Sequence, residues 1–176
     1  GGPGSLSGMW NYFPMQFADH SILYIRNEED TGHVPLYDAR RIWSDPAKPI
    51  EELGDVVYEH KLKPGTRMMT GSIVRFPHAP GGPIEITCEP LLHAFIAIGT
   101  GYGVENDWRH GMWQGPLVVQ GKSYKTAEIA PIGQLTIVDH VARFSYGGKV
   151  GYGLYEHGFF GPFRKYGMKD RADGAS

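Results

Sequence analysis

Hydrophobic and polar residues alternate along most of this chain in short runs, and clusters of Gly, Pro, Asn and Asp separate one run from the next. Alternation with a period of two is typical of β-strands that bury one face, and the clusters are typical of turns. Few windows keep a sustained helical period, and residues 44–54 are expected to form a loop with one helical turn. The pattern predicts about ten strands, at residues 9–17, 21–27, 33–43, 55–62, 67–76, 84–89, 91–99, 111–120 and 124–129 and in a closing hairpin within 137–169.

The closing hairpin is the strongest local signal. Two alternating runs flank the pair Gly147-Gly148, which suits a two-residue turn in which both residues take a positive φ. Many antiparallel strands joined by hairpins, with little helix, predict an all-β domain that forms a barrel or a strongly bent half-barrel. A barrel of about eight strands can hold one small ligand inside.

The composition supports this fold class. The 176 residues include 25 glycines, 10 tyrosines, 8 phenylalanines and 4 tryptophans. Aromatic side chains pack well on pleated sheets, and glycines permit turns and sharp strand bends. The length suits one domain with a sizeable core. Residues 1–8 are expected to be a linker or tag remnant, and residues 171–176 a disordered tail.

Charge and cysteine content exclude several classes of function. The net charge is −2 and the Lys and Arg residues are scattered, which argues against a nucleic-acid partner. No apolar run is long enough to span a bilayer. The single cysteine, Cys88, cannot form an intrachain disulfide. This cysteine usage is typical of a reducing compartment, so a cytoplasmic location is expected.

Residues 99–115 combine charged groups with aromatic rings. Tyr102, Trp108 and Trp113 alternate there with acidic and basic residues that include His110. In one interpretation the segment is a rim loop that covers the mouth of a pocket and places an acid and a base beside it. In the other it is a wide hairpin end, with solvated charges and rings that cap the barrel. The sequence leaves both interpretations open.

The closing hairpin also carries ionisable side chains on strands that otherwise suit a core. His140 lies on the more apolar face of its strand, and either Glu156 or His157 must face inward on the next strand. We expect His140 and Glu156 to face inward together, as a base and an orienting carboxylate for proton transfer. The alternative is a buried ion pair that only stabilises this end of the barrel.

Metal and cofactor chemistry have little support in the sequence. The eight histidines form no HExxH motif and no close pair with metal-ligand spacing. Cys88 lies on an apolar strand face, where a small buried side chain is the usual explanation. We therefore expect no metal and no cofactor.

The motifs in the last third of the chain resemble a known group of proteins. They are similar to the C-terminal part of bacterial AttH-like proteins, which have a lipocalin-type fold and are related to carotenoid 1,2-hydratase and the fungal decalin-forming cyclases. The opening strands, MWNYFPMQFADHSILYI, are also similar to that domain. The matching residues are Gly101, Tyr102, Gly103, Trp108, His110, Gly111, Trp113 and Gly115, followed by His140, Gly151, Gly153, Glu156, Gly161, Pro162 and Gly167.

This resemblance implies a lipocalin-like, calycin-type antiparallel barrel over residues 9–170 that binds a hydrophobic, terpenoid- or lipid-like molecule. The related activities imply hydration, isomerisation or cyclisation without a cofactor. Such proteins usually have two lipocalin-like halves, whereas this chain has the length of one, so a second lipocalin-like domain or a homodimer partner is expected. Glu156 and His140 would be the catalytic acid and base, and the substrate would contact Tyr102, Trp108, His110, Trp113 and Tyr152.

The alternative is a non-catalytic domain that serves as a structural or assembly half of a protein with two lipocalin-like domains. Its aromatic side chains would then fill the interior, and Glu156 and His140 would be a satisfied pair.

Overall fold

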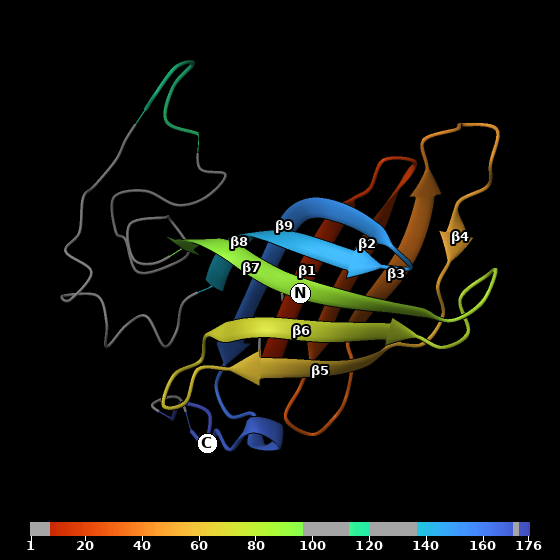
Figure 1. The fold of residues 1–176 in the computed structure, drawn as a ribbon. Helices are drawn as coiled ribbons and strands as arrows, with labels where there is room; N and C mark the ends of the chain where they lie inside the picture. The colour runs from red at the N-terminus through yellow and green to blue at the C-terminus, as the bar shows by residue number, and fades with distance from the viewer. Residues whose placement is uncertain (1–7, 97–112, 120–136, 171–172) are drawn as a thin grey trace.

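The structure is a computed structural model that describes residues 8–96, 113–119, 137–170 and 173–176. Its described part forms one antiparallel sheet of nine strands, in the order β4-β3-β2-β1-β9-β8-β7-β6-β5 (Figure 1). The only helical element in these ranges is one 3-10 turn, η1 (Arg164–Tyr166). The strands are β1 (Gly8–Gln16), β2 (His20–Glu28), β3 (Leu36–Trp43), β4 (Glu51–Glu52), β5 (Val57–Leu62), β6 (Met69–Phe76), β7 (Ile84–Ile96), β8 (Ile137–Tyr146) and β9 (Lys149–Phe160).

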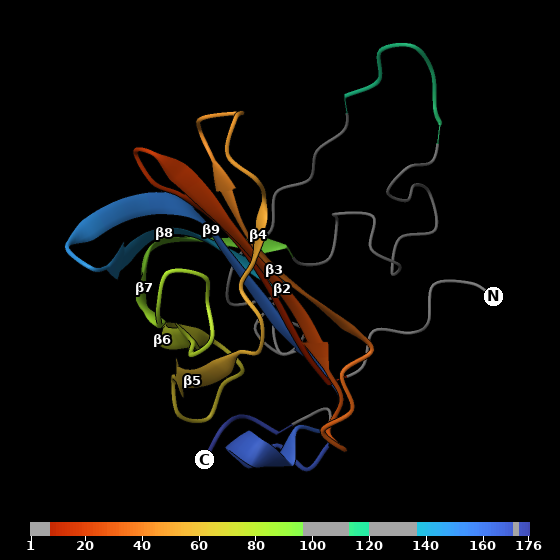
Figure 2. The ribbon, with the colours of Figure 1, turned by 90° about the vertical axis from the view of Figure 1, so that its right-hand side faces the viewer.

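The sheet curls into a half-barrel. Figure 2 shows β5 and β6 brought round toward β2 and β3, which lie near the other edge of the sheet. The Tyr58 hydroxyl on β5 donates a hydrogen bond of 2.7 Å to Glu28 on β2. The Tyr24 and Phe76 rings, on β2 and β6, have centroids 6.1 Å apart. The predicted all-β, barrel-like fold class is therefore confirmed, with nine strands in the described residues.

The closing hairpin has the predicted turn. Tyr146 and Lys149 pair across it, and Gly147 and Gly148 take φ values of 52° and 76°. Two consecutive positive φ values are what this tight turn requires, and glycine takes them without a steric penalty. The hairpin prediction is confirmed.

Strand β9 joins the two halves of the sheet, because it pairs with both β1 and β8. Glycine is required at Gly153, since a Cβ atom there would lie 2.0 Å from the carbonyl oxygen of Pro14. Such glycines allow the close backbone approach that a strongly bent sheet needs.

Several predicted boundaries differ from the structure. Residues 84–89 and 91–99 were expected as two strands, but β7 runs unbroken through them to Ile96 and its register with β8 shifts between Pro90 and Leu92. A proline lacks the N–H that a regular ladder needs, so it is accommodated at an irregularity instead of ending the strand. Residues 44–54 form no helical turn and contain β4 instead.

The predicted strand at 111–120 is not formed by residues 113–119, which have no strand conformation. The predicted strand at 124–129 lies outside the described residues. Gly8, assigned from the sequence to the linker, is the first residue of β1.

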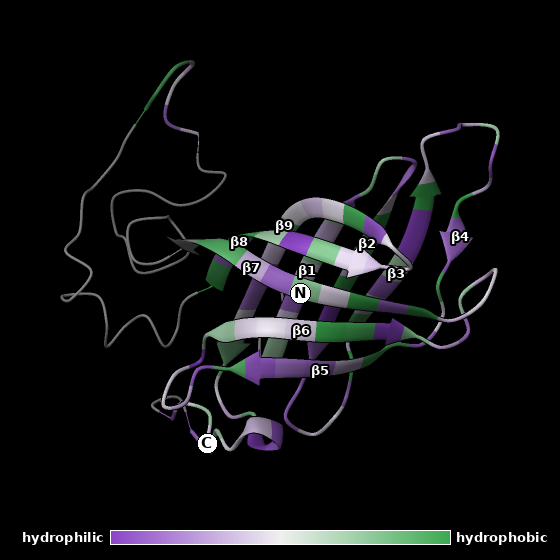
Figure 3. Ribbon diagram, in the orientation of Figure 1, coloured by the Kyte–Doolittle hydropathy of each residue, from purple (hydrophilic) through white to green (hydrophobic). Residues whose placement is uncertain are grey.

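The core covers the concave face of the sheet. Strand β1 illustrates the alternation, with Met9, Asn11, Phe13 and Met15 buried and the residues between them partly exposed. On β8 the buried side chains are Val138, His140, Ala142 and Phe144. Figure 3 shows hydrophobic and hydrophilic residues interleaved along the strands, as this alternation requires.

The last residues close one end of the half-barrel. Arg67 donates hydrogen bonds to the carbonyls of Gly161, at 2.7 Å, and of Asp173, at 2.8 Å. The Ala175 N–H donates to the Thr66 carbonyl at 2.8 Å. Residues 173–176, which fall in the predicted tail, therefore lie against the turn between β5 and β6.

Candidate functional site

Two histidines from neighbouring strands meet on the concave face. His140 on β8 and His157 on β9 are both fully buried. Their rings stack with centroids 5.0 Å apart, and their Nε2 atoms are 2.9 Å apart. Strand β6 adds a third group, because the Met69 N–H donates to His157 Nε2 at 3.2 Å.

These contacts define the tautomer of each ring. An imidazole nitrogen that accepts a hydrogen bond from a backbone N–H carries no proton. His157 Nε2 is therefore the acceptor of the pair, and His140 Nε2 is the donor.

A second chain of polar groups lies beside the histidine pair. The Tyr155 hydroxyl on β9 hydrogen-bonds to the Ser72 hydroxyl on β6, and Ser72 Oγ lies 2.6 Å from His60 Nδ1 on β5. The Tyr155 hydroxyl also lies 3.3 Å from the sulfur of Met69. The ring of Tyr155 is 5.5 Å from that of His140, so the two chains are adjacent.

Burial keeps this second chain uncharged. It raises the pKa of Tyr155 well above its usual value. The pKa of His60 falls to about 3 because burial disfavours the imidazolium and because the cationic Lys165 and Arg26 are close. At neutral pH the chain is therefore a neutral phenol, a hydroxyl and a neutral imidazole.

Aromatic rings line the concave face around these groups. Phe13 stacks on Tyr155 with a centroid separation of 4.3 Å and an interplanar angle of 15°. Tyr24 lies 5.3 Å from Phe13 and continues the wall toward Phe76. The buried polar groups therefore lie in an apolar, largely aromatic environment.

Three buried polar atoms in this region have no hydrogen-bond partner among the described residues. They are the Tyr24 hydroxyl, Asn11 Oδ1 and His60 Nε2. Leaving such a group without a partner costs about 1–3 kcal/mol, and nearly all buried polar atoms in proteins do have one. These atoms could each bind a polar group of a ligand or an ordered water.

The predicted pair of His140 and Glu156 is not formed. Glu156 pairs in register with Asp139, the neighbour of His140, so it lies on the opposite face of the sheet. There it accepts a hydrogen bond of 2.6 Å from the indole N–H of Trp10. The expectation that both face inward is wrong because strand parity puts His157 inward and Glu156 outward.

Glu156 and Asp139 form a pair of partly buried carboxyls on that outer face. Burial raises the pKa of both. For Glu156 the Trp10 hydrogen bond lowers the pKa and the neighbouring Asp139 raises it further.

The residues predicted to contact substrate do not gather in the described structure. Trp113 is 78% exposed and Tyr152 is 55% exposed. Tyr102, Trp108 and His110 lie outside the described residues, as does most of the predicted rim loop.

Four buried residues of this region were not predicted as site residues from the sequence. His157, Tyr155, Ser72 and Asn11 all contribute to the buried polar region. Strand parity within the hairpin could have found His157, because it alternates with Glu156. No local signal marks Ser72 or Asn11, since Asn11 lies opposite His157 through the register of β1 with β9, and Ser72 meets Tyr155 through the curl of the sheet.

Cys88 is buried and burial raises the pKa of its thiol, as expected for a small core side chain. Within the described ranges, no group of three or more His, Cys, Asp or Glu side chains is arranged to hold a metal ion. The same ranges contain no helix with the length and apolar character needed to cross a membrane.

The fold and this region define a class of protein, namely a curled antiparallel β half-barrel with neutral polar groups buried in an aromatic interior. Residues 3–169 match a family of unknown function, DUF8625, and the chain belongs to that family. Comparisons with curated proteins and with solved structures give no significant match.

Proposed function

We propose that this protein binds an apolar small molecule, terpenoid- or lipid-like, against the concave face of its half-barrel, in the manner of a lipocalin-like domain. The observation that carries the proposal is an aromatic wall with three buried polar atoms that lack a partner among the described residues. Sites for apolar ligands generally combine an apolar lining with a few placed polar groups. The resemblance of the closing hairpin and the opening strands to AttH-like domains also supports it.

We extend this proposal to acid/base chemistry without a cofactor, such as hydration, isomerisation or cyclisation. His140 keeps the role of base, with His157 in place of Glu156 as the partner that orients it. Tyr155, whose phenol is neutral and whose ring lies 5.5 Å from that of His140, is the proposed proton donor. Aromatic faces next to these groups can stabilise a developing carbocation.

A second candidate is the non-catalytic domain, in which the interior only holds the sheet together. The direct stacking of Phe13 on Tyr155 favours it, because these rings occupy part of the concave face with the protein's own side chains. In this candidate His140 and His157 are a satisfied pair that stabilises the fold.

Ligand titration separates the two candidates. The full chain, delipidated by reverse-phase extraction and refolding, is titrated with farnesol, all-trans-retinol and oleate, and binding is followed by calorimetry and native mass spectrometry. The proposal expects one molecule to bind per chain, and His140→Gln to weaken binding about tenfold, ~1.4 kcal/mol. The matched control is His78→Gln, since His78 is exposed. Failure of all three probes to bind the refolded wild type would favour the structural candidate.

A further inference from the structure

A separate polar network lies at one end of the concave face. Tyr146 is the last residue of β8 and continues its inward-facing series of His140, Ala142 and Phe144. His20 is the first residue of β2, is 1% exposed and pairs in register with Trp43 of β3. These side chains therefore lie where the β1–β2 and β8–β9 turns border the interior. We call this end the mouth of the half-barrel.

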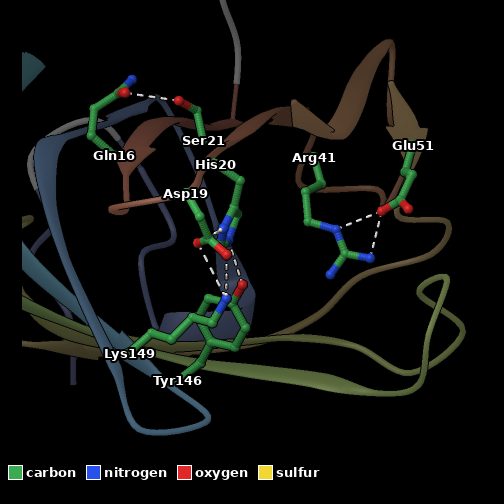
Figure 4. Close-up of polar contacts among 8 residues, drawn as sticks. All are labelled: Gln16, Asp19, His20, Ser21, Arg41, Glu51, Tyr146 and Lys149. Carbon is green, nitrogen blue, oxygen red and sulfur yellow. Dashed lines mark hydrogen bonds and ion pairs between the residues drawn. The ribbon is translucent and has the colours of Figure 1, made fainter. Parts of the chain in front are cut away.

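Asp19, His20 and Tyr146 form a continuous hydrogen-bonded chain there (Figure 4). Asp19 Oδ1 lies 2.7 Å from His20 Nδ1, and His20 Nε2 contacts the Tyr146 hydroxyl. Lys149 and His20 lower the pKa of Asp19 to about 2, so this carboxylate only accepts hydrogen bonds. His20 Nδ1 is thus the donor to Asp19, His20 Nε2 is the acceptor, and the Tyr146 phenol donates its proton to it.

Aromatic neighbours hold this chain in place. Phe17 stacks on the His20 ring at 4.9 Å and 13°, and meets the Tyr146 ring edge-on at 5.0 Å. Trp43 packs on His20 at 5.3 Å. The imidazole is therefore fixed between rings, in an orientation that serves both hydrogen bonds.

Two cations border the chain. Lys149 Nζ lies 3.0 Å from Asp19 Oδ2. Arg41 is held by Glu51 at 2.5 Å and by the Pro80 carbonyl at 2.7 Å. Burial raises the pKa of Tyr146, while the charges of Lys149 and Arg41 act in the opposite direction. The phenol is therefore protonated at rest, beside charges that would stabilise an anion.

We propose that Asp19, His20 and Tyr146 form a proton relay in which Tyr146 acts as a general base on a bound carbon acid, a ketone whose apolar body lies against the concave face. In the step, the C–H bond next to the carbonyl breaks and its proton passes to the Tyr146 oxygen. The phenol proton passes to His20 Nε2, and Asp19 stabilises the imidazolium. The electron pair of the C–H bond forms an enolate beside Arg41, and reversal of these transfers returns every proton.

The location of the network argues for a role beyond a structural tie. The Lys149–Asp19 ion pair already links the two turns without the histidine. With His20 and Tyr146, the chain contains an imidazole base that a carboxylate orients. Its outermost group is the partly exposed phenol of Tyr146. This is the arrangement of nucleophile or acid, base and orienting group that proton-transfer sites use. The expectation that the ketone has an apolar body depends on the proposed function, whereas the proton relay does not depend on it.

Hydrogen–deuterium exchange tests the relay directly. The full chain is incubated in D2O with 2-undecanone, which has an apolar tail, or with cyclohexanone, which needs no extended apolar site. Exchange of the protons next to the carbonyl is followed by proton NMR. We expect wild type to accelerate exchange and Tyr146→Phe to reduce the catalysed rate on the order of 100-fold. Tyr12→Phe is the matched control, since Tyr12 lies on the partly exposed face of β1 and pairs in register with Ile25 and Glu156, outside the network.

Asp19→Asn tests the positioning residue. It should lower the exchange rate and change the tautomer of His20, which 15N NMR of the imidazole reports, while binding of the ketone is retained. Far-ultraviolet circular dichroism and urea unfolding establish that each variant is folded. Since Phe keeps the ring of Tyr146 and its contact with Phe17, we expect this variant to fold.

The outcomes separate the two proposals. Acceleration of cyclohexanone but not of 2-undecanone would support the relay and count against an apolar ligand in the interior. Exchange of both ketones no faster with wild type than with Tyr146→Phe would overturn the relay. A His20 tautomer with the proton on Nε2 in wild type would overturn it as well.

Discussion

His140 and His157 stand on adjacent strands with their Nε2 atoms 2.9 Å apart, inside a face of the sheet that is otherwise largely aromatic. Because His157 Nε2 also accepts the Met69 N–H, the contact joins three strands, β6, β8 and β9. The pair therefore connects strands of the curled sheet and also places two imidazoles in its interior.

Replacing His157 by Phe should destabilise the protein by about 1–3 kcal/mol, because a buried Met69 N–H and His140 Nε2 would lose their acceptor. Urea unfolding measures the change as a lower midpoint with an unchanged slope. His78→Phe is the control, since His78 is exposed. Equal midpoints for the two variants would mean that the His140–His157 contact does not stabilise the fold.

His60 should make the protein less stable in mild acid. Its folded pKa of about 3 is below the value of 6.5 for a free histidine, so the unfolded chain binds the proton more readily. The contribution of neutral His60 to the free energy of unfolding is fully present above pH 6.5. It is lost as the pH falls toward about 3, and the free energy of unfolding then changes by at most about 1.4 kcal/mol per pH unit. His60→Gln should flatten the stability profile in this window, as measured by urea unfolding at each pH. An identical profile in the variant would show that folding does not lower the pKa of His60.

Glu156 should affect the pH dependence of stability in the opposite sense to His60, and Glu156→Gln should remove that effect. The pKa of Glu156 is raised in the folded protein by burial and by Asp139. A raised carboxyl pKa favours the fold at low pH, and the contribution is lost as the pH rises through the folded value. The variant keeps an acceptor for the Trp10 N–H without the charge, so it should gain stability at pH 7 relative to pH 4.

Thermal unfolding at both pH values checks the Glu156 prediction. Glu59→Gln is the control, since Glu59 is exposed and its carboxylate pairs with Arg75. A Glu156→Gln variant that is less stable than wild type at both pH values would show that the charge of Glu156 helps the fold.

Gly153→Ala should disrupt the junction between β1 and β9. The added Cβ would lie 2.0 Å from the Pro14 carbonyl oxygen, so a strand must move. Overpacking of this kind typically costs about 1–3 kcal/mol. Gly71→Ala is a matched control in β6, where the nearest atom would be 3.3 Å away. Calorimetric melting compares the two, and a Gly153→Ala variant as stable as Gly71→Ala would mean that the strands are not as close as described.

Parts of the interior were predictable, and others were not. Alternation on β8 correctly placed His140 on the buried face, because the two-residue period of a strand is a local property. The pairing of His140 with Glu156 was wrong because the register between two strands decides which residues share a face. In the observed register His140 stands opposite Tyr155 and Asp139 stands opposite Glu156.

The chain by itself determined its β-strands, its tight turn at Gly147-Gly148 and the identity of its apolar faces, since these follow from side-chain alternation and from the φ values that glycine allows. Only the tertiary structure decided which polar groups meet inside. Ser72 and Tyr155 are 83 residues apart and come together because the sheet curls. Tyr146 reaches His20 for the same reason, whereas Asp19 is the neighbour of His20 in the sequence. Contacts between distant strands depend on curvature and register, and no short stretch of sequence encodes either one.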